Sequence, residues 1–438
     1  MSSFWILFFF SVISFAIHPL KNRKLFALLG VVGAIAAVFF HIPMGMEGFG
    51  TTSAIELFEM VLLGVVFGVV VSEEEPLSIT QTLFITTASI ALLEAQTMIG
   101  FILSFEALSI ISFVLVSHIK DKKTALGAMR LYLAGALATG LVLFGTALYL
   151  LDGFSLNESL HVEGAFSLLG IWMILSGVFY KLTVIPMHTW ATQSYALIKP
   201  SHAAVLSAIT KAVVVVAVFH FFMPFLEHFR DFNQDIFIVL ALVTMTLGNI
   251  LALFQKHIGK ILAYSSVAHA GYMLLGFVAL QSSYASYGVL YIAITYMITQ
   301  SAIFILLDIL SKGSNTITLN DLKGLSSKDK KSAFFLSIQL FSLAGIPLLG
   351  GFLAKAVLVY AVVDANLWIV ALITLLNSAL SVGYYAWIIK HIYFDSPADV
   401  SLALQKLNSS AFFAQVLLML AILFFGIFAY SIFNITFS

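Results

Sequence analysis

The chain has 438 residues, of which 61% are hydrophobic and only 10% are charged, a balance that excludes a soluble domain with a wettable surface. Its 21 basic and 21 acidic residues leave no basic face for nucleic acid, and the lack of cysteine excludes disulfides, iron–sulfur clusters and thiolate metal sites on this chain. The bilayer is therefore the expected solvent, and any redox centre has to lie on a partner.

Apolar windows long enough to cross about 30 Å of hydrocarbon recur along the whole chain, and each predicts a transmembrane helix. The first window has no basic residue before it and no small-residue cleavage pattern after it, so we expect a retained helix and not a signal peptide. In chain order, the predicted spans are 3–19, 25–41, 53–71, 78–95, 97–117, 125–150, 166–186, 201–224, 235–254, 260–281, 285–311, 332–362, 366–389 and 411–435. The predicted fold class is all-α integral membrane, a single polytopic domain over 1–438 with about fourteen helices.

The basic residues outside these spans divide unevenly between the two sides of the membrane. If the N-terminus is outside, sixteen lysines and arginines fall in inner loops, and only Arg230 falls in an outer loop. Inner loops carry the lysine and arginine excess in membrane proteins. We therefore predict a multi-pass protein of a bacterial inner membrane with both termini on the outer side.

Four basic residues remain inside the predicted spans, namely Arg130, Lys181, Lys211 and Lys355. A charge at mid-membrane costs at least about 2.5–3.5 kcal/mol to insert, so it is retained mainly where it faces a hydrated cavity or a partner charge. Arg130 lies near the inner end of its span, where a long side chain can reach the lipid headgroups. It is therefore interpreted either as a lipid-facing residue with no role in transport or as part of the ion path. The three lysines are the candidates for an ion path.

An Ile-Pro helix break lies close to two of these lysines. Lys181 precedes Pro186, and Lys355 follows Gly345 and Pro347. The breaks fall in spans seven and twelve, so these helices run in opposite directions, as an inverted repeat requires, and such paired breaks mark midplane ion sites in transporters. Ordinary proline kinks with lysines paired to unseen acids are the alternative. The predicted divisions are three N-terminal helices (1–77), a first five-helix repeat (78–224), a second five-helix repeat (235–389) and a C-terminal helix (411–435).

Acidic and histidine side chains within the spans are candidates for a proton relay. Glu106 is the deepest acid available to Lys181, and a carboxylate within about 4–6 Å favours a protonated lysine. His188 beside the first break and His269 are relay candidates, because imidazole titrates near neutral pH. The 14-residue spacing of His188 and His202 also occurs in haem-binding helices, but the polar stretch between them argues against a continuous helix there. The acids near span ends are interpreted as structural: Glu56, Glu59, Glu94 and Asp308.

Several sequence blocks resemble the antiporter-like subunits of proton-pumping NADH:quinone oxidoreductase, respiratory complex I, and their relatives in Mrp-type sodium/proton antiporters and membrane-bound hydrogenases. Within this superfamily, the chain is most similar to chain N, because it has a lysine at 355, a tyrosine pair in GYYAWIIKHIYF (383–394) and the turn LYLLDG (148–153). The blocks that carry the resemblance are FEALSI (105–110), KLTVIPMHTW (181–190), SHAAVLSAITK (201–211), QKHIGKILAYSSVAHAGY (255–272), NDLKGL (320–325) and SLAGIPLLGGFLAK (342–355).

The resemblance implies a proton path of inverted half-channels, with Glu106 and Lys181 as the coupling pair, Lys211 as the central relay and Lys355 as the gate of the second half. It implies a membrane subunit of a NADH:quinone oxidoreductase that holds no redox centre, cofactor or metal itself. Quinone reduction in other membrane subunits would drive the protons, and quinone, FMN and iron–sulfur clusters are expected on those partners.

Two other functions stay open. A hydrogenase or Mrp-type antiporter subunit is one, because the segment ending at Arg130 lacks the expected lysine-tyrosine pair and glutamate. Sodium transport is ranked below proton transport, since a sodium site favours clustered carboxylates and the spans offer lysines. The second open function is a structural scaffold, in which the buried lysines only form ion pairs.

Overall fold

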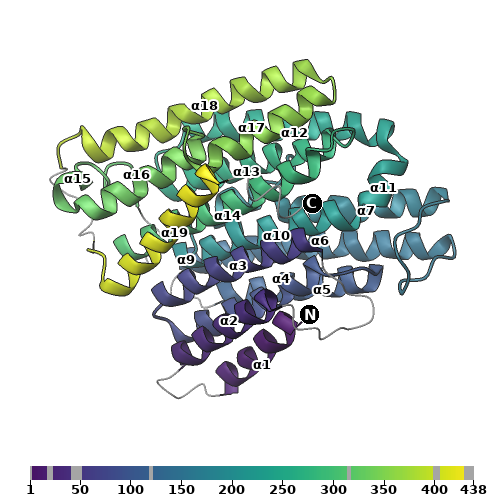
Figure 1. Ribbon diagram of the computed structural model, residues 1–438, viewed down its shortest axis with the longest axis horizontal. Coiled ribbons are helices and arrows are strands. Elements are labelled where there is room, and N and C mark those ends of the chain that lie inside the picture. Colours follow the sequence, from purple (N-terminus) through teal and green to yellow (C-terminus); the bar gives the residue numbers. More distant parts are fainter. Residues whose placement is uncertain are drawn as a thin grey trace.

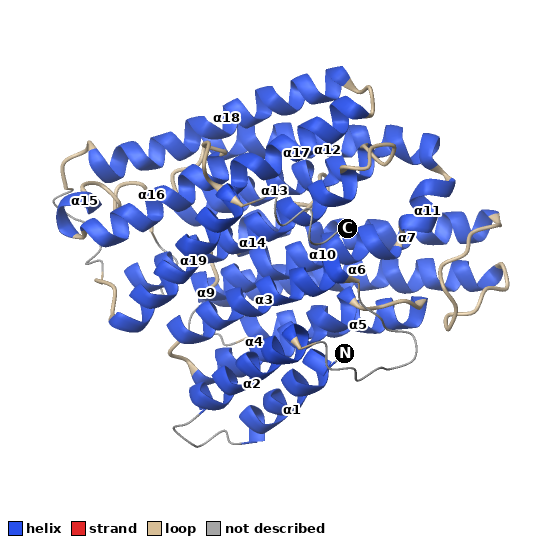
Figure 2. Cartoon of the chain, in the orientation of Figure 1, coloured by secondary structure: helices blue, strands red, loops and turns tan. Residues whose placement is uncertain are grey.

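The computed structural model describes residues 2–16, 23–40, 52–117, 122–312, 317–397 and 405–428, and within them every named element is a helix. One isolated β-bridge within these residues joins His257 and Thr318. The helices lie side by side in one bundle, with α1 and α2 on one flank, α13 and α14 in the middle, and α17 and α18 on the other flank (Figure 1). Figure 2 shows how short most of the connecting loops are. The predicted all-α class is confirmed.

The structure describes the following helices in chain order. They are α1 (Ser2–Ala16), α2 (Arg23–Phe39), α3 (Ser53–Ser72), α4 (Pro76–Leu93), α5 (Met98–Val116), α6 (Lys122–Leu151), α7 (Ala165–Leu182), α8 (Thr189–Ser194), α9 (Pro200–Ala204), the π-helical turn η1 (Val205–Ile209), α10 (Thr210–Phe221), α11 (Met223–His228), α12 (Arg230–Leu253), α13 (Ile258–Val278), α14 (Ala285–Leu310), α15 (Leu325–Lys328), α16 (Lys330–Ala344), α17 (Gly350–Asp364), α18 (Trp368–Tyr393) and α19 (Ser409–Ile427).

Eleven helices of the described chain are long and apolar enough to cross a membrane. They are α3 to α7, the continuous segment α9–η1–α10, α12, α13, α14, α18 and α19. Helices α1 and α2 are apolar but shorter, with 15 and 17 residues. Helices α16 and α17 have 15 residues each, because a break separates them. The chain is therefore a multi-pass membrane protein.

Two predicted spans differ from the helices in a way that bears on the site. The predicted span 166–186 ends early, since α7 stops at Leu182, and the predicted span 332–362 is divided into α16 and α17. The ends of three predicted spans, at 17–19, 41 and 429–435, lie outside the described residues, as do Lys21 and Lys120 of the predicted inner loops.

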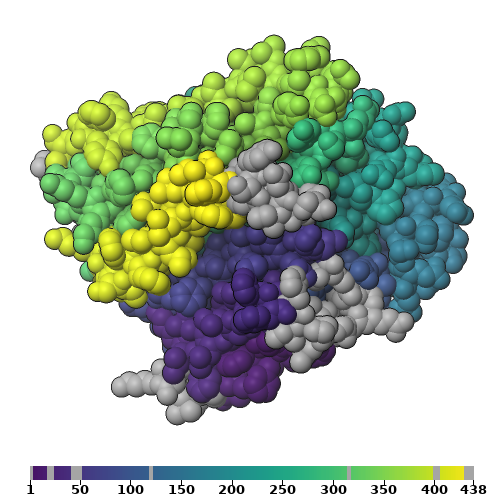
Figure 3. All heavy atoms as spheres, viewed as in Figure 1, coloured from purple at the N-terminus to yellow at the C-terminus, as the bar shows by residue number. Residues whose placement is uncertain are grey.

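Helix α14 is completely buried over an 18-residue stretch, and α10 and α13 are almost as deeply buried. Helices α6, α12 and α18 instead leave most of their surface uncovered, as helices at the lipid boundary do. Helix α19 crosses the surface between the N-terminal helices and the second half of the chain (Figure 3). Polar side chains on α10, α13 and α14 therefore lie far from lipid.

Glycines allow the backbones of neighbouring helices to approach closely at two hairpins. A Cβ added at Gly145 on α6 would lie 2.4 Å from the carbonyl oxygen of Gly170 on α7, which leaves no room for a side chain. Between α12 and α13, a Cβ at Gly248 would lie 2.6 Å from the nitrogen of Ala268. Small residues of this kind drive helix association in membranes, where burial of apolar surface does not.

Candidate functional site

Both predicted helix breaks are present and use the same backbone motif. At the end of α7, Thr183 has a φ of 62°, its N–H donates to the carbonyl of Tyr180 at 3.2 Å, and the N–H of Val184 donates to that of Phe179 at 3.0 Å. This pattern caps the last carbonyls of a helix by a residue in the left-handed region. The motif, and not Pro186, therefore ends α7.

The second break repeats this arrangement at the end of α16. Gly345 has a φ of 87° and donates to the carbonyl of Ser342 at 3.0 Å, while Ile346 donates to that of Phe341 at 3.0 Å. After Pro347, the chain turns into α17, where a Cβ at Gly351 would lie 1.9 Å from the carbonyl oxygen of Ser342. The glycine therefore allows α17 to begin directly against the end of α16.

Lys355 points back from α17 to the carbonyl end of α16. Its Nζ donates to the carbonyls of Leu343 at 3.0 Å and Ala344 at 3.2 Å, and to the hydroxyls of Ser378 at 3.4 Å and Ser381 at 3.3 Å. The carbonyl end of a helix carries partial negative charge. The end of the half-helix therefore stabilises the positive charge of the buried amine without a formally charged partner, as in transporters with interrupted helices.

Lys211 joins the first break to the centre of the bundle. Its side chain is fully buried, and its Nζ donates to Thr183 Oγ1 at 2.6 Å, to Ser266 Oγ at 2.6 Å and to the Ser266 carbonyl at 2.9 Å. The hydroxyl of Tyr296 on α14 donates to the same Ser266 Oγ at 2.8 Å and to the carbonyl of Ser207 at 3.1 Å. Ser207 lies in η1, and π-helical turns of this kind frequently occur at functional sites.

Lys181 and Glu106 are neighbours but form no ion pair within the described residues. Lys181 Nζ donates to the hydroxyls of Ser109 and Ser112, each at 3.4 Å. Glu106 accepts a hydrogen bond of 2.7 Å from Thr139 through one oxygen, and its other oxygen is buried without a hydrogen-bond partner. Glu106 precedes Ser109 by one helical turn on α5, so its carboxylate lies on the face that holds Lys181.

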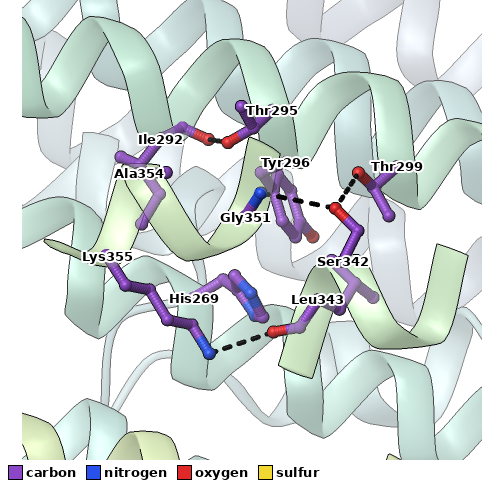
Figure 4. A pocket seen from close by; sticks show the side chains of 10 residues that line it. All are labelled: His269, Ile292, Thr295, Tyr296, Thr299, Ser342, Leu343, Gly351, Ala354 and Lys355. Carbon is purple, nitrogen blue, oxygen red and sulfur yellow. Dashed lines mark hydrogen bonds between the residues drawn. The ribbon is translucent and has the colours of Figure 1, made fainter. Parts of the chain in front are cut away.

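His269 lies beside a small cavity between Lys355 and the surroundings of Lys211. Its Nδ1 is 2.9 Å from the Ser265 carbonyl, which fixes the ring, and its ring centroid is 5.1 Å from that of Tyr296. The cavity has a volume of about 10 Å³, enough for roughly one water molecule. Figure 4 shows its lining, which includes His269, Tyr296, Thr295, Thr299, Ser342 and Lys355.

The remaining candidates lie at the margin of this site. His188 is half-buried in the first break, with its Nδ1 3.3 Å from the Pro186 carbonyl and its ring 6.4 Å from that of Tyr264. Arg130 is partly exposed on α6 and makes no ion pair within the described chain. The relay role of His188 and the role of Arg130 stay predictions.

The structure also shows a partly buried ion cluster that the sequence did not suggest. Lys199 Nζ lies 2.7 Å from Glu73, 3.7 Å from Glu75 and 3.9 Å from Asp308. Burial raises the pKa of Glu73, but the charge and hydrogen bond of Lys199 lower it more, so the pKa is below its usual value. Burial lowers the pKa of Lys199, but Asp308 and Glu73 raise it more. Asp308, interpreted from the sequence as a structural acid, lies in this cluster, and its role stays a prediction.

Sequence reasoning also missed the hydroxyls that hold Lys211. Thr183 and Ser266 lie in two of the blocks that carried the family resemblance, but no local pattern indicates that they meet the same amine. Over the part of the chain that the structure describes, no group of three or more histidine, aspartate or glutamate side chains is arranged to hold a metal ion.

A family model described as "NADH:quinone oxidoreductase/Mrp antiporter, TM" matches residues 95–381. The F(420)H(2) dehydrogenase subunit N of Methanosarcina mazei is 29% identical over 416 residues, which cover 86% of this chain and 84% of that protein. The NADH-quinone oxidoreductase subunit N 1 of Solibacter usitatus is 33% identical over 337 residues, which cover 74% and 69%. A chain of respiratory complex I from Thermus thermophilus has the same fold, with a TM-score of 0.87 and 23% identity over 99% of this chain and 98% of that one.

Proposed function

Because this chain belongs to the NADH:quinone oxidoreductase/Mrp antiporter transmembrane family, we propose that it translocates protons as the N-type membrane subunit of a respiratory NADH:quinone oxidoreductase. Relatives at 30–33% identity bear the name NADH-quinone oxidoreductase subunit N. Quinone reduction in partner subunits, which hold the quinone, FMN and iron–sulfur clusters, supplies the energy. This chain, with no redox centre of its own, moves the protons.

The proposed topology has fourteen spans with both termini on the outer side. It counts the eleven long apolar helices, the shorter α1 and α2, and the interrupted pair α16–α17 as one span. The contact between Lys199 and Glu73 supports it, because both residues are then on the inner side. The shared backbone motif at the two breaks supports inverted repeats over 78–224 and 235–389.

One observation carries the proton-relay proposal. Lys181, Lys211 and Lys355 lie on three different helices, and within the described residues each is bound by hydroxyls or carbonyls and by no carboxylate. A buried lysine with only neutral partners leaves no unpaired acid behind when it releases its proton. Such a group can load and unload, whereas a lysine in a closed ion pair holds its charge.

The contacts support one order for the proposed relay. Thr183, which accepts from Lys211, is two residues beyond Lys181 on the same broken helix. From Lys211, the hydrogen bonds through Ser266 and Tyr296 reach the cavity that His269 and Lys355 also line. A proton on one lysine disfavours a proton on the next by Coulomb repulsion, which is strong at low dielectric. Movement of Glu106 toward Lys181 would load the first lysine.

The alternatives concern the driving reaction. The similarity to a F(420)H(2) dehydrogenase subunit favours another electron donor, and the Mrp part of the family favours ion exchange without electron transfer. Each alternative keeps the same lysines but changes what starts the relay.

Proton pumping by the intact complex in membrane vesicles tests this proposal. The variants are Lys181→Met and, as a matched control, Lys330→Met, which changes an exposed lysine at the start of α16. We expect NADH to drive pumping in the native and control vesicles, and Lys181→Met to abolish it. Pumping driven only by hydrogen or by reduced F420 would assign the chain to another oxidoreductase. Pumping unchanged in Lys181→Met would refute the relay.

A further inference from the structure

The protonated form of Lys355 has an aromatic neighbour besides its hydrogen-bond acceptors. Its Nζ lies over the ring of Tyr272 on α13, 5.0 Å from the ring centroid. No carboxylate pairs with Lys355 within the described residues. The electron-rich ring face of a tyrosine attracts an ammonium group, and more strongly where water is excluded. The ring is therefore a source of stabilisation for the lysine charge.

Tyr272 is fully buried and belongs to a polar network that the relay does not use. Asn249 on α12 points its Nδ2 toward the Tyr272 hydroxyl at 3.5 Å and donates to Asn377 Oδ1 on α18 at 3.2 Å. Asn249 Oδ1 accepts from the hydroxyl of Tyr384 at 3.1 Å, and Asn377 donates to Thr246 at 3.0 Å. Buried amides that satisfy one another in this way hold a single arrangement.

The close approach of α12 and α13 makes this network possible. Gly248, next to Asn249, packs against the backbone of Ala268, one helical turn before Tyr272. Asn249 therefore reaches across the hairpin to the tyrosine, while Asn377 and Tyr384 hold it from the other side. The network ties three helices together behind the ring that faces Lys355.

The other titratable groups near Lys355 are few. His269 comes from α13, next to Tyr272, and Tyr296 comes from α14 across the cavity. Helix α16 presents carbonyls, and α18 presents serine hydroxyls and, behind Tyr272, the phenol of Tyr384. Helix α19 has no titratable residue in its sequence. The charge on Lys355 therefore depends on neutral groups, among which the ring of Tyr272 can be changed without removing a hydrogen bond to the lysine.

We propose that Tyr272 is a positioning residue for proton transfer at Lys355: its ring supports the ammonium form, and the network of Asn249, Asn377 and Tyr384 holds the ring in place. This inference rests on the proposed function, since it assigns the group that tunes one lysine of the relay. The hydroxyl of Tyr272 serves only to connect the ring to Asn249, and takes no proton from the lysine.

The test compares variants of Tyr272 in the intact complex, with proton pumping per electron measured in vesicles across pH. Tyr272→Phe keeps the ring, whereas Tyr272→Leu and the flexible Tyr272→Met remove it and fill part of its space. Loss of a cation–ring contact corresponds to a shift of about 0.4–1.5 pH units, with the larger values expected where water is excluded. We expect the alkaline limb of the profile to move to lower pH by this amount in the Leu and Met variants, and by less in Tyr272→Phe, which keeps the ring but loses its contact with Asn249.

Other outcomes separate this inference from the proposed function. An unshifted profile in both ringless variants, or an equal shift in Tyr272→Phe, would overturn the role of the ring. If the Leu and Met variants of Tyr272 do not assemble, Asn249→Leu replaces them, because this variant removes the residue that contacts the Tyr272 hydroxyl. The proposal then requires Asn249→Leu to move the alkaline limb of the pH profile to lower pH. Lys355→Met tests the relay itself, because normal pumping by that variant would refute the proposed function whatever the tyrosine variants do.

Discussion

The two hydroxyls that bind Lys211 give a prediction that depends on the tertiary structure alone. Thr183 has a φ of 62°, a region that costs a residue other than glycine about 1–3 kcal/mol. A β-branched residue is expected in this conformation only if its side chain has a specific role. The Oγ1 of Thr183 accepts a hydrogen bond of 2.6 Å from Lys211 Nζ, which supplies such a role. Thr183→Val keeps the branched shape and removes this acceptor, whereas Thr183→Ser keeps the hydroxyl.

The size of the effect follows from the number of acceptors. A hydrogen bond to a charged group contributes about 1.5–3 kcal/mol, which corresponds to about 1–2 pH units in the protonation of the lysine. Ser266→Ala removes a second hydroxyl but leaves the Ser266 carbonyl at 2.9 Å. Because both hydroxyls bind one amine, we expect the double variant to shift the profile by less than the sum of the single shifts.

The assay is proton pumping per electron in vesicles between neutral and alkaline pH, with electron transfer recorded separately. We expect the alkaline limb to move to lower pH in Thr183→Val and Ser266→Ala, and Thr183→Ser to follow the native profile. A uniform loss of pumping with no shift along the pH axis would show that these residues only hold the helix break together. Native profiles in both single variants would refute the assignment of Lys211 as a protonated relay.

Two further predictions concern stability and are checked by thermal unfolding of the detergent-solubilised complex. Gly351→Ala is expected to destabilise the second break, because the new Cβ would lie 1.9 Å from the Ser342 carbonyl; Gly140→Ala, with nothing within 4 Å of its Cβ, is the matched neutral change. Lys199→Met is expected to cost about 1.5–3 kcal/mol near neutral pH, since it leaves Glu73 without its cation. The pKa of Glu73 is lowered, so the stabilisation by Lys199 is fully present above the usual value of 4.5. It is lost as the pH falls through the lowered pKa. The melting temperatures of the native protein and the variant should therefore converge in acid. Equal melting of the two glycine variants, or a Lys199→Met difference that grows in acid, would contradict these accounts.

The amino-acid sequence by itself determined the membrane class, the breaks near Pro186 and Pro347, and the three lysines that lie within the helices. These features are local, because the free energy of moving a residue into the bilayer depends mainly on its side chain, and helix-breaking residues act on their own turn. The end of α7 at Leu182 was not evident, because a threonine in the left-handed conformation gives no clear signal in a sequence.

Only the tertiary structure decided which groups meet each lysine. Ser266 lies 55 residues from Lys211, and Tyr272 reaches Lys355 from a different helix. Glu106, the expected partner of Lys181, is bound instead to Thr139, and Asp308 joins a cluster around Lys199. Hydropathy places a residue at a depth in the membrane but not at an angle around its helix. The partners of a buried charge depend on which faces of distant helices pack together, and that is set by the complete bundle.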